Sequence, residues 1–333
     1  MIKKQHYYFG VLGLLVVCIL SVCAVSVVNN QEKEYRSLFL RHTKFFAPEV
    51  PAKASFAGEE VPLDLYYVRE AFEREILANT FMHSTSIVMF KRANRWFPVI
   101  EPILKKNGIP DDFKFLAIAE SNLINVVSPA GAEGYWQFIK PTGQKYGLEV
   151  NDNVDERYNM EKATQAACDY FNDAFKSFKS WTLVAASYNR GMDGIQKALD
   201  NQKVSNYYDL YLNDETSRYI FRIMAIREVY NHPVNYGFYL REQDFYPPIP
   251  ARLVTIDSSI GSLPAFAKTL SINYRILREM NPWIQSYSLP NKSKKSYTFR
   301  IPKDGAISYD MLLKKVPLHE TFFHDTLKIK DIH

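Results

Sequence analysis

The chain has 333 residues, of which 47% are hydrophobic and 14% aromatic, enough for one sizeable core and a small second module. Its formal net charge is +5 and no basic run stands out, so the composition gives no indication of nucleic-acid binding. Two of the three cysteines lie in an apolar N-terminal run. Cys168 is therefore alone in the body of the chain, which excludes a disulfide framework within a domain.

Residues 7–28 carry no charged side chain and follow a pair of lysines. A run of this length can cross a bilayer core of ~30 Å at ~1.5 Å per residue, and the basic residues before it place the rest of the chain outside the cytoplasm. The sequence therefore predicts that residues 1–28 are an uncleaved membrane anchor and that the body lies on the periplasmic side of the cell membrane. A cleaved signal peptide is the alternative, because "AVS" near the end of the run resembles a cleavage site. The body is exported in either case.

The next segment, residues 29–62, contains several prolines and little periodicity, and it is predicted to be a tether. The pattern is then helical almost throughout residues 63–240. Apolar residues from Ala163 to Phe178 recur at i, i+3 and i+4, which indicates a buried helix face, and Asn159 is a suitable N-cap for that helix. No alternating strand pattern occurs up to the end of this segment, so residues 63–240 are predicted to form an all-α domain.

A proline-rich stretch precedes a second module. Residues 241–251 include "YPPIP" and are predicted to be a linker. Within residues 252–303, "LVTI" and "YTFRIP" are typical of short strands, and they bracket helical stretches at 259–270 and 273–281. A tail, residues 304–333, follows. The predicted fold class is therefore mainly α, with a helical domain followed by a small β-α-α-β module.

Glu120 is the first candidate for chemistry. Asp111 and Asp112 suit the first turn of a helix, and Glu120 falls in its last turn, where the negative end of the helix dipole disfavours an ionised carboxylate. Burial among Leu116 and Ile118 would also raise the pKa of Glu120. Cleavage of a glycosidic bond needs an acid that is still protonated near neutral pH, because the leaving oxygen must receive a proton. A solvated surface glutamate is the alternative interpretation.

Further short elements follow the Glu120-Ser121 pair. In chain order they are "SPAG" (128–131), "GYWQF" (134–138), "AASYNRG" (185–191) and "ETSRY" (215–219). Taken together, these elements resemble the lytic murein transglycosylases of the soluble-lytic-transglycosylase (SLT) type, glycoside hydrolase family 23, and most of all their membrane-bound type D branch. The resemblance covers about residues 63–240 and implies a lysozyme-like helical domain. Gly-Tyr-Trp-Gln replaces the typical Gly-Leu-Met-Gln, a departure that puts the fine substrate preference in doubt.

The resemblance implies a role for each motif residue. The predicted site consists of the catalytic Glu120 and the substrate-binding Ser121, Ser128, Gln137, Tyr188, Asn189 and Tyr219. Glu120 would be the sole catalytic acid and base. Gln137 would line the sugar-binding groove, Tyr188 and Asn189 would hydrogen-bond near the catalytic carboxyl and the sugar N-acetyl group, and Tyr219 would close the groove from a later helix.

Several neighbouring features allow a structural interpretation beside the functional one. Tyr135 and Trp136 either offer flat faces to pyranose rings or belong to the core. Glu215 is either a second catalytic carboxylate or a structural residue near an N-cap. The segment 150–159 resembles a calcium loop, but it lacks the glycine and the terminal glutamate of an EF-hand, so a turn is favoured. No metal site and no cofactor are predicted.

Residues 252–303 resemble a degenerate LysM module. The stretch from "LVTI" to "REMNPWI" follows the strand, helix and helix of that module, and "YTFRIP" is a suitable last strand. The usual Gly-Asp after the first strand is replaced by Asp257-Ser258, which leaves the affinity of the module for glycan open.

The resemblance implies a peptidoglycan lytic transglycosylase that serves cell-wall turnover. It would cleave the β-1,4 bond between N-acetylmuramic acid and N-acetylglucosamine and form a 1,6-anhydromuramic end. Its partners would be peptidoglycan glycan strands and, through the N-terminal segment, the membrane. One alternative is a goose-lysozyme-like muramidase that hydrolyses the bond with a second acid such as Glu215 or Asp193. The other alternative is a non-catalytic peptidoglycan-binding scaffold.

Overall fold

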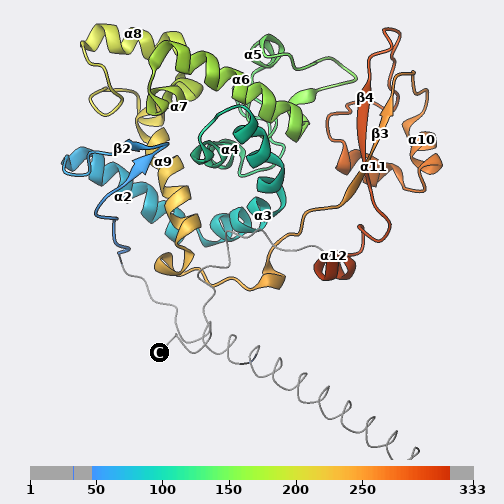
Figure 1. The fold of residues 1–333 in the computed structure, drawn as a ribbon, viewed down its shortest axis with the longest axis horizontal. Coiled ribbons are helices and arrows are strands. Elements are labelled where there is room, and N and C mark those ends of the chain that lie inside the picture. Colours follow the sequence, from blue (N-terminus) through green and yellow to red (C-terminus); the bar gives the residue numbers. More distant parts are fainter. Residues whose placement is uncertain (1–32, 34–46, 316–333) are drawn as a thin grey trace, which may run out of the picture. The chain divides into compact units, whose positions relative to one another are not determined.

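The computed structural model describes residue 33 and residues 47–315 (Figure 1). The predicted membrane anchor, residues 1–28, lies outside the described residues. Within the described part, no helix has the length and apolar character needed to cross a bilayer. The described residues from Pro48 onward belong to one compact unit.

The first domain is a set of helices preceded by a short hairpin. The hairpin strands, β1 (Ser55–Phe56) and β2 (Glu59–Glu60), pair antiparallel. The α-helices are α2 (Tyr66–Phe81), α3 (His83–Lys106), α4 (Lys114–Ser121), α5 (Lys140–Lys145), α6 (Met160–Phe178), α7 (Trp181–Arg190), α8 (Met192–Gln202) and α9 (Asp214–Asn231). Short 3₁₀ helices occur at η1 (Asp111–Phe113), η2 (Glu156–Tyr158), η3 (Pro233–Tyr236) and η4 (Glu242–Asp244). The predicted helical character of this part of the chain is confirmed.

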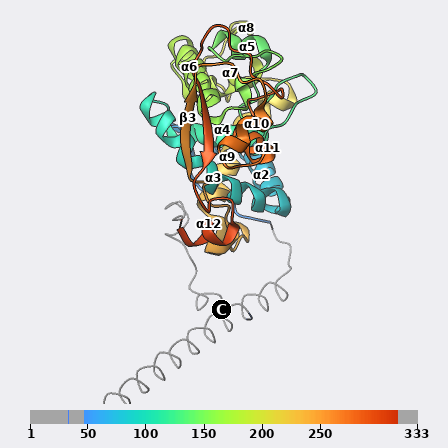
Figure 2. The ribbon, with the colours of Figure 1, turned by 90° about the vertical axis from the view of Figure 1, so that its right-hand side faces the viewer.

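Helix α4 lies in the middle of the helical domain, among α3, α6, α7 and α9 (Figures 1 and 2). Its residues from Lys114 to Ile118 are all buried, as expected for a helix that has neighbours on every side. The helix ends at Ser121 and is capped by Asn122, which adopts a left-handed conformation with φ 50°. Glu120 therefore falls in the last turn, as the sequence predicts.

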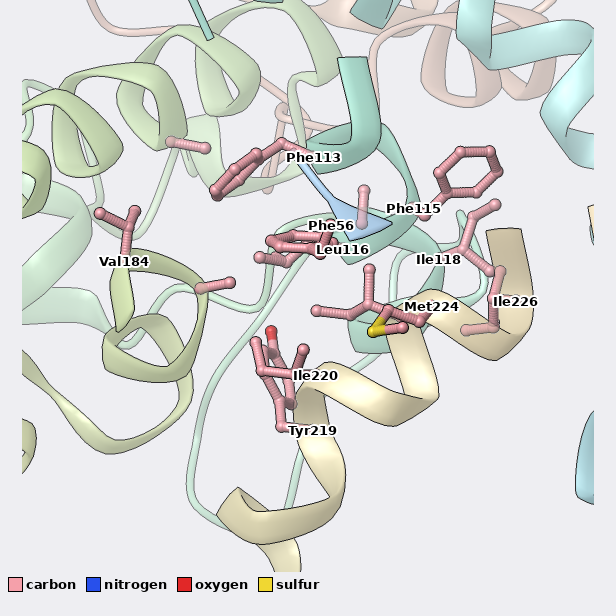
Figure 3. Packing of buried hydrophobic residues seen from close by; sticks show 14 of the residues in the cluster. Phe56, Phe113, Phe115, Leu116, Ile118, Val184, Tyr219, Ile220, Met224 and Ile226 are labelled. Atoms are coloured by element: carbon pink, nitrogen blue, oxygen red, sulfur yellow. The ribbon is translucent and has the colours of Figure 1, made fainter. Parts of the chain in front are cut away.

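One apolar cluster fills the helical domain. Figure 3 shows the hairpin residue Phe56 beside Leu116 of α4, with Ile220 and Met224 of α9 in the same cluster. These four side chains are fully buried. Truncation of a large buried side chain typically costs ~2–5 kcal/mol, so this cluster fixes α4 between the hairpin and α9.

The hairpin is not among the predicted elements, because strands of two residues show no alternation that a pattern could reveal. It is held by two carboxylates. Glu59 accepts a hydrogen bond from Ser180 Oγ at 2.9 Å, at the start of α7. Asp112, in the 3₁₀ helix η1 just before α4, accepts a hydrogen bond from Ala57 N at 2.7 Å and pairs with Arg227 of α9.

The C-terminal module has the predicted β-α-α-β order. Its elements are β3 (Ala251–Ile256), α10 (Leu263–Thr269), α11 (Tyr274–Met280) and β4 (Tyr297–Pro302), followed by α12 (Tyr309–Lys315). β3 and β4 pair antiparallel, with Ala251 opposite Pro302. The module has an apolar cluster of its own, in which Leu263, Leu277 and Phe299 are fully buried.

Candidate active site

Glu120 and Tyr219 come together from two helices that are distant in the sequence. Glu120 lies in the last turn of α4, and Tyr219 lies in α9 with only 2% of its surface exposed. The Tyr219 hydroxyl donates a hydrogen bond to Glu120 Oε1. In Figure 3 the Tyr219 ring points from α9 toward the cluster around Leu116 of α4. The structure thus joins two residues that the sequence assigns to one site.

Protein atoms surround the carboxyl group of Glu120, although the residue as a whole keeps some solvent contact. This burial raises the pKa of Glu120 from its ordinary value of 4.5 to about 7. The hydrogen bond from Tyr219 and the positive charge of Arg222 act in the opposite direction, and the charge of Glu215 adds to the increase. A carboxyl group with this pKa can donate a proton near neutral pH and then take one up.

The loop of residues 126–138 packs against the end of α4. Ser121 Oγ, next to the candidate acid, donates a hydrogen bond to Tyr135 O at 2.7 Å. Tyr188 of α7 donates a hydrogen bond from its hydroxyl to Trp136 O at 2.7 Å. Helices α4 and α7 therefore hold this loop beside the site. Ser121 is buried, and its hydroxyl group supports the loop by its bond to the backbone carbonyl of Tyr135.

Gln137 and Ser128 also take part in the folding of this loop. Gln137 has a positive φ of 51°, and its Nε2 donates hydrogen bonds to Val126 O at 3.0 Å and to Gly134 O at 2.8 Å. Ser128 Oγ accepts a hydrogen bond from Ala132 N at 3.0 Å. These contacts give both side chains a part in shaping the loop. Their role in sugar binding stays a prediction.

Tyr188 and Asn189 lie at the end of α7 and connect to different neighbours. Burial raises the pKa of Tyr188 well above its ordinary value, and the charge of Glu120 is the next cause, which places the two groups near each other. Asn189 Nδ2 donates to Glu215 Oε1 at 3.0 Å, and Thr216 Oγ1 donates to Asn189 Oδ1 at 2.8 Å. Asn189 therefore links α7 to the start of α9.

The two aromatic residues of "GYWQF" belong to the core. Tyr135 is 6% exposed and Trp136 is fully buried, with its Nε1 donating to Thr164 Oγ1 at 2.9 Å. The interpretation of these rings as stacking surfaces for sugars is therefore wrong for this structure. The alternative, a place in the core, is confirmed.

Charged residues that support α9 are not among the predicted site residues. Glu75 of α2 is 2% exposed, and its carboxylate pairs with Arg218 Nε at 2.6 Å and with Arg222 Nε at 3.8 Å. Arg222 in turn lowers the pKa of Glu120 through its charge. One signal was available, because Glu75 interrupts an apolar helix face and a carboxylate in that position needs a partner.

The segment 150–159 forms a turn, with a bridge between Val150 and Asp155 followed by η2. Among the residues that the structure describes, no group of three or more His, Cys, Asp and Glu side chains is placed to hold a metal ion. Cys168 is a free, buried cysteine, and burial raises the pKa of its thiol to about 12.

A helical domain with one buried acid at the end of a central helix, followed by a β-α-α-β module, is the architecture that the SLT resemblance implies. Residues 97–210 match the family model of the transglycosylase SLT domain. Residues 252–305 match that of the soluble lytic transglycosylase C-terminal LysM-like domain. The resemblance is thereby confirmed, and the chain carries an SLT transglycosylase domain followed by a LysM-like domain.

The chain is also similar to a named relative of the type D branch. It is 28% identical over 199 residues to the membrane-bound lytic murein transglycosylase D of Escherichia coli strain K12. The protein of the same name from Escherichia coli O6:H1 gives the same identity. The matched region is 57% of this chain and 43% of each relative, so the chain spans less than half the length of the curated relatives that it matches.

Proposed function

We propose that this protein is a peptidoglycan lytic transglycosylase. It cleaves the β-1,4 bond between N-acetylmuramic acid and N-acetylglucosamine and leaves a 1,6-anhydromuramic end, as a step in cell-wall turnover. The observation that carries this proposal is the Glu120 carboxyl group, which is buried in an SLT domain, bonded to Tyr219 and given a pKa of about 7.

In the first half of the proposed reaction, protonated Glu120 acts as the general acid. It gives its proton to the glycosidic oxygen as the bond to the muramic acid anomeric carbon breaks, and N-acetylglucosamine leaves with a free 4-hydroxyl group. The Tyr219 hydroxyl hydrogen-bonds to the carboxylate that remains and so stabilises the ionised form.

In the second half, the Glu120 carboxylate takes the proton from the 6-hydroxyl of the same muramic acid. The 6-oxygen then forms a bond to the anomeric carbon and closes the 1,6-anhydro ring. Glu120 gives up one proton in the first half and takes up one in the second, so the enzyme returns to its starting form without a water molecule as reactant. One carboxylate is sufficient for this sequence, whereas an inverting hydrolase needs a second one to activate water.

The goose-lysozyme-like muramidase is the second candidate, because Glu215 lies near enough for its charge to raise the pKa of Glu120. Glu215 is exposed and is bonded to Asn189. Under the proposal its carboxylate orients Asn189 and activates no water. Its substitution by Gln therefore separates the two reactions.

We place the enzyme on the periplasmic side of the cell membrane, held by residues 1–28. The membrane-bound relatives support this location. We also propose that Ser128, Gln137 and Asn189 bind the glycan strand, and that the LysM-like module contributes to binding of peptidoglycan.

Mass spectrometry of the muropeptides released from purified sacculi tests the reaction. The proposal expects 1,6-anhydro ends, one water lighter than reducing ends, and no uptake of heavy oxygen from labelled water. Glu120→Gln should lower turnover by at least ~10²-fold, because positioned acid catalysis contributes about 10²–10⁴. The matched control Glu215→Gln should retain most of the activity. Labelled reducing ends that disappear in the Glu215 variant would establish the muramidase instead, and absence of any product would favour a scaffold.

A further inference from the structure

The segment of residues 149–157 belongs to the SLT domain by sequence but is packed into the LysM-like module. Val154 is 1% exposed and is part of the apolar cluster of the module. Its backbone forms a β-bridge with Ile284, and the next residue, Asp155, donates its backbone N–H to Trp283 O at 2.8 Å. The backbone of this segment is therefore paired with the backbone of the module.

Charged and polar contacts flank this pairing. Lys295 of the module pairs with Glu149, and Tyr297 of β4 donates from its hydroxyl to Glu149 Oε1 at 3.0 Å. Arg300 of β4 pairs with Glu161 at the start of α6. Apolar burial, backbone pairing and ion pairs all join the module to the segment 149–161, so several kinds of contact hold the two together.

The same segment supports the active-site loop through Arg157. This residue is 4% exposed, and its Nε and Nη2 donate to the two oxygens of Asp155 at 2.9 and 2.6 Å. Its Nη2 also lies 3.0 Å from Glu133 Oε1, and its Nη1 donates to Phe138 O at 3.2 Å. A planar guanidinium with five donors can satisfy these acceptors together, which a lysine cannot do.

The backbone of Arg157 also lies against the loop, at Gly134. A Cβ atom on Gly134 would lie only 2.0 Å from Arg157 O, so the loop requires glycine at this point. Three residues further on, Gln137 is held in a left-handed conformation that costs a non-glycine residue ~1–2 kcal/mol. A strained residue persists only where its surroundings determine it, and Arg157 forms a large part of those surroundings.

We propose that Arg157 is a positioning residue for the loop 126–138 and that docking of the LysM-like module on Val154 and Asp155 keeps Arg157 in place. The inference rests on the proposed function, because it concerns glycan binding by that loop. The module thereby contributes to binding in the catalytic groove itself, in addition to any retention on the cell wall. Glu120 and Tyr219 are held by α4 and α9, so the chemical step depends on the module much less than binding does.

Val154→Asp in the full chain tests the proposal, because a carboxylate in the apolar cluster of the module opposes docking. The matched control is Leu253→Asp, which places the same group on a side chain of β3 that is 66% exposed. With a soluble, peptide-free glycan tetrasaccharide as substrate, Val154→Asp should raise KM at least ~5-fold and change kcat less than ~2-fold. Arg157→Lys should give the same split, and Leu253→Asp should resemble the wild type. A wild-type KM in the Val154 variant, with weaker binding to sacculi alone, would overturn the proposal.

Hydrogen exchange gives a readout that does not depend on activity. The amides of Glu133 and Gly134 are bonded to Phe138 O and Val126 O at 3.1 Å each, so they report on the loop. In Val154→Asp we expect them to exchange at least ~10-fold faster, with α9 unchanged. Unchanged loop exchange beside faster exchange in the module would refute the coupling. An inactive wild type would refute the proposed function and leave this measurement to decide the inference.

A second variant keeps the test valid if Val154→Asp does not fold. The double variant Lys295→Gln/Arg300→Gln removes the flanking ion pairs from the module side and leaves Glu156 paired with Lys162. The same KM increase and faster loop exchange are expected, each to a smaller extent. Wild-type values of both in a folded double variant would count against the proposal.

Discussion

The raised pKa of Glu120 has a consequence for stability that can be measured without any substrate. In the unfolded chain the carboxyl group titrates at its ordinary value of 4.5, and in the folded protein at about 7. Between these values the folded state binds more protons, so the free energy of unfolding falls as the pH rises from 4.5 through 7. The contribution is fully present below pH 4.5 and is lost above pH 7.

Glu120→Gln removes this pH dependence, because the amide has nearly the same shape and does not titrate. The interval from 4.5 to about 7, at ~1.4 kcal/mol per pKa unit, corresponds to about 3 kcal/mol. The remaining solvent contact of the residue makes this an upper value. Relative to the wild type, the Gln variant should therefore become more stable by up to about 3 kcal/mol between pH 4 and pH 8.

Urea unfolding of both proteins at several pH values provides the measurement, and the difference between them cancels the contributions of all other titrating groups. If the wild-type and Glu120→Gln stabilities run parallel from pH 4 to pH 8, burial does not raise the pKa of this carboxyl group and the reasoning is wrong.

Three further substitutions test the surroundings of the site. Tyr219→Phe removes a hydrogen bond that lowers the pKa of Glu120, so the alkaline limb of the kcat/KM profile should move to higher pH by about one to two units, since a bond to a charged group contributes ~1.5–3 kcal/mol. Glu75→Gln should lower the free energy of unfolding by about 2–3 kcal/mol, less than for a fully buried ion pair because its arginine partners keep solvent contact; urea titration measures this. Gly134→Ala should cost at least ~2 kcal/mol in the same titration, because its Cβ would overlap a carbonyl oxygen, whereas Gly147→Ala, at nearly the same φ but in open space, should cost about 1 kcal/mol.

Local signals in the sequence predicted much of the fold. The apolar spacing of α6 and its N-cap are both confirmed, and Asn159 Oδ1 accepts the N–H of Lys162 at 3.0 Å. The two predicted strands of the module are also confirmed. They could be predicted because alternation within six residues is a local property of the sequence. The hairpin at residues 55–60 escaped prediction because its strands are too short to have a period.

The candidate site was less accessible to prediction from local patterns. Glu120 can be singled out from its own helix, since both its burial and its place at the negative end of the dipole follow from the residues next to it in the sequence. Its bond to Tyr219 joins positions 99 residues apart, and only the resemblance to a family placed them together. The same limit explains why Arg157 was missed, because its importance comes from acceptors on a loop some 20 residues earlier and from a module that follows much later in the chain.

The contacts of the hairpin β1–β2 have a mechanical consequence for a protein that we propose to be held by its N-terminal segment. A pull on the chain from that side would enter the helical domain through the hairpin. It would load the contacts of Glu59 with α7 and of Ala57 with Asp112. Asp112 also pairs with Arg227 of α9, so tension would be shared between the helix that supplies Tyr219 and the turn that starts the helix of Glu120. Tension on the N-terminal segment would therefore reach both helices of the Glu120–Tyr219 pair through the hairpin.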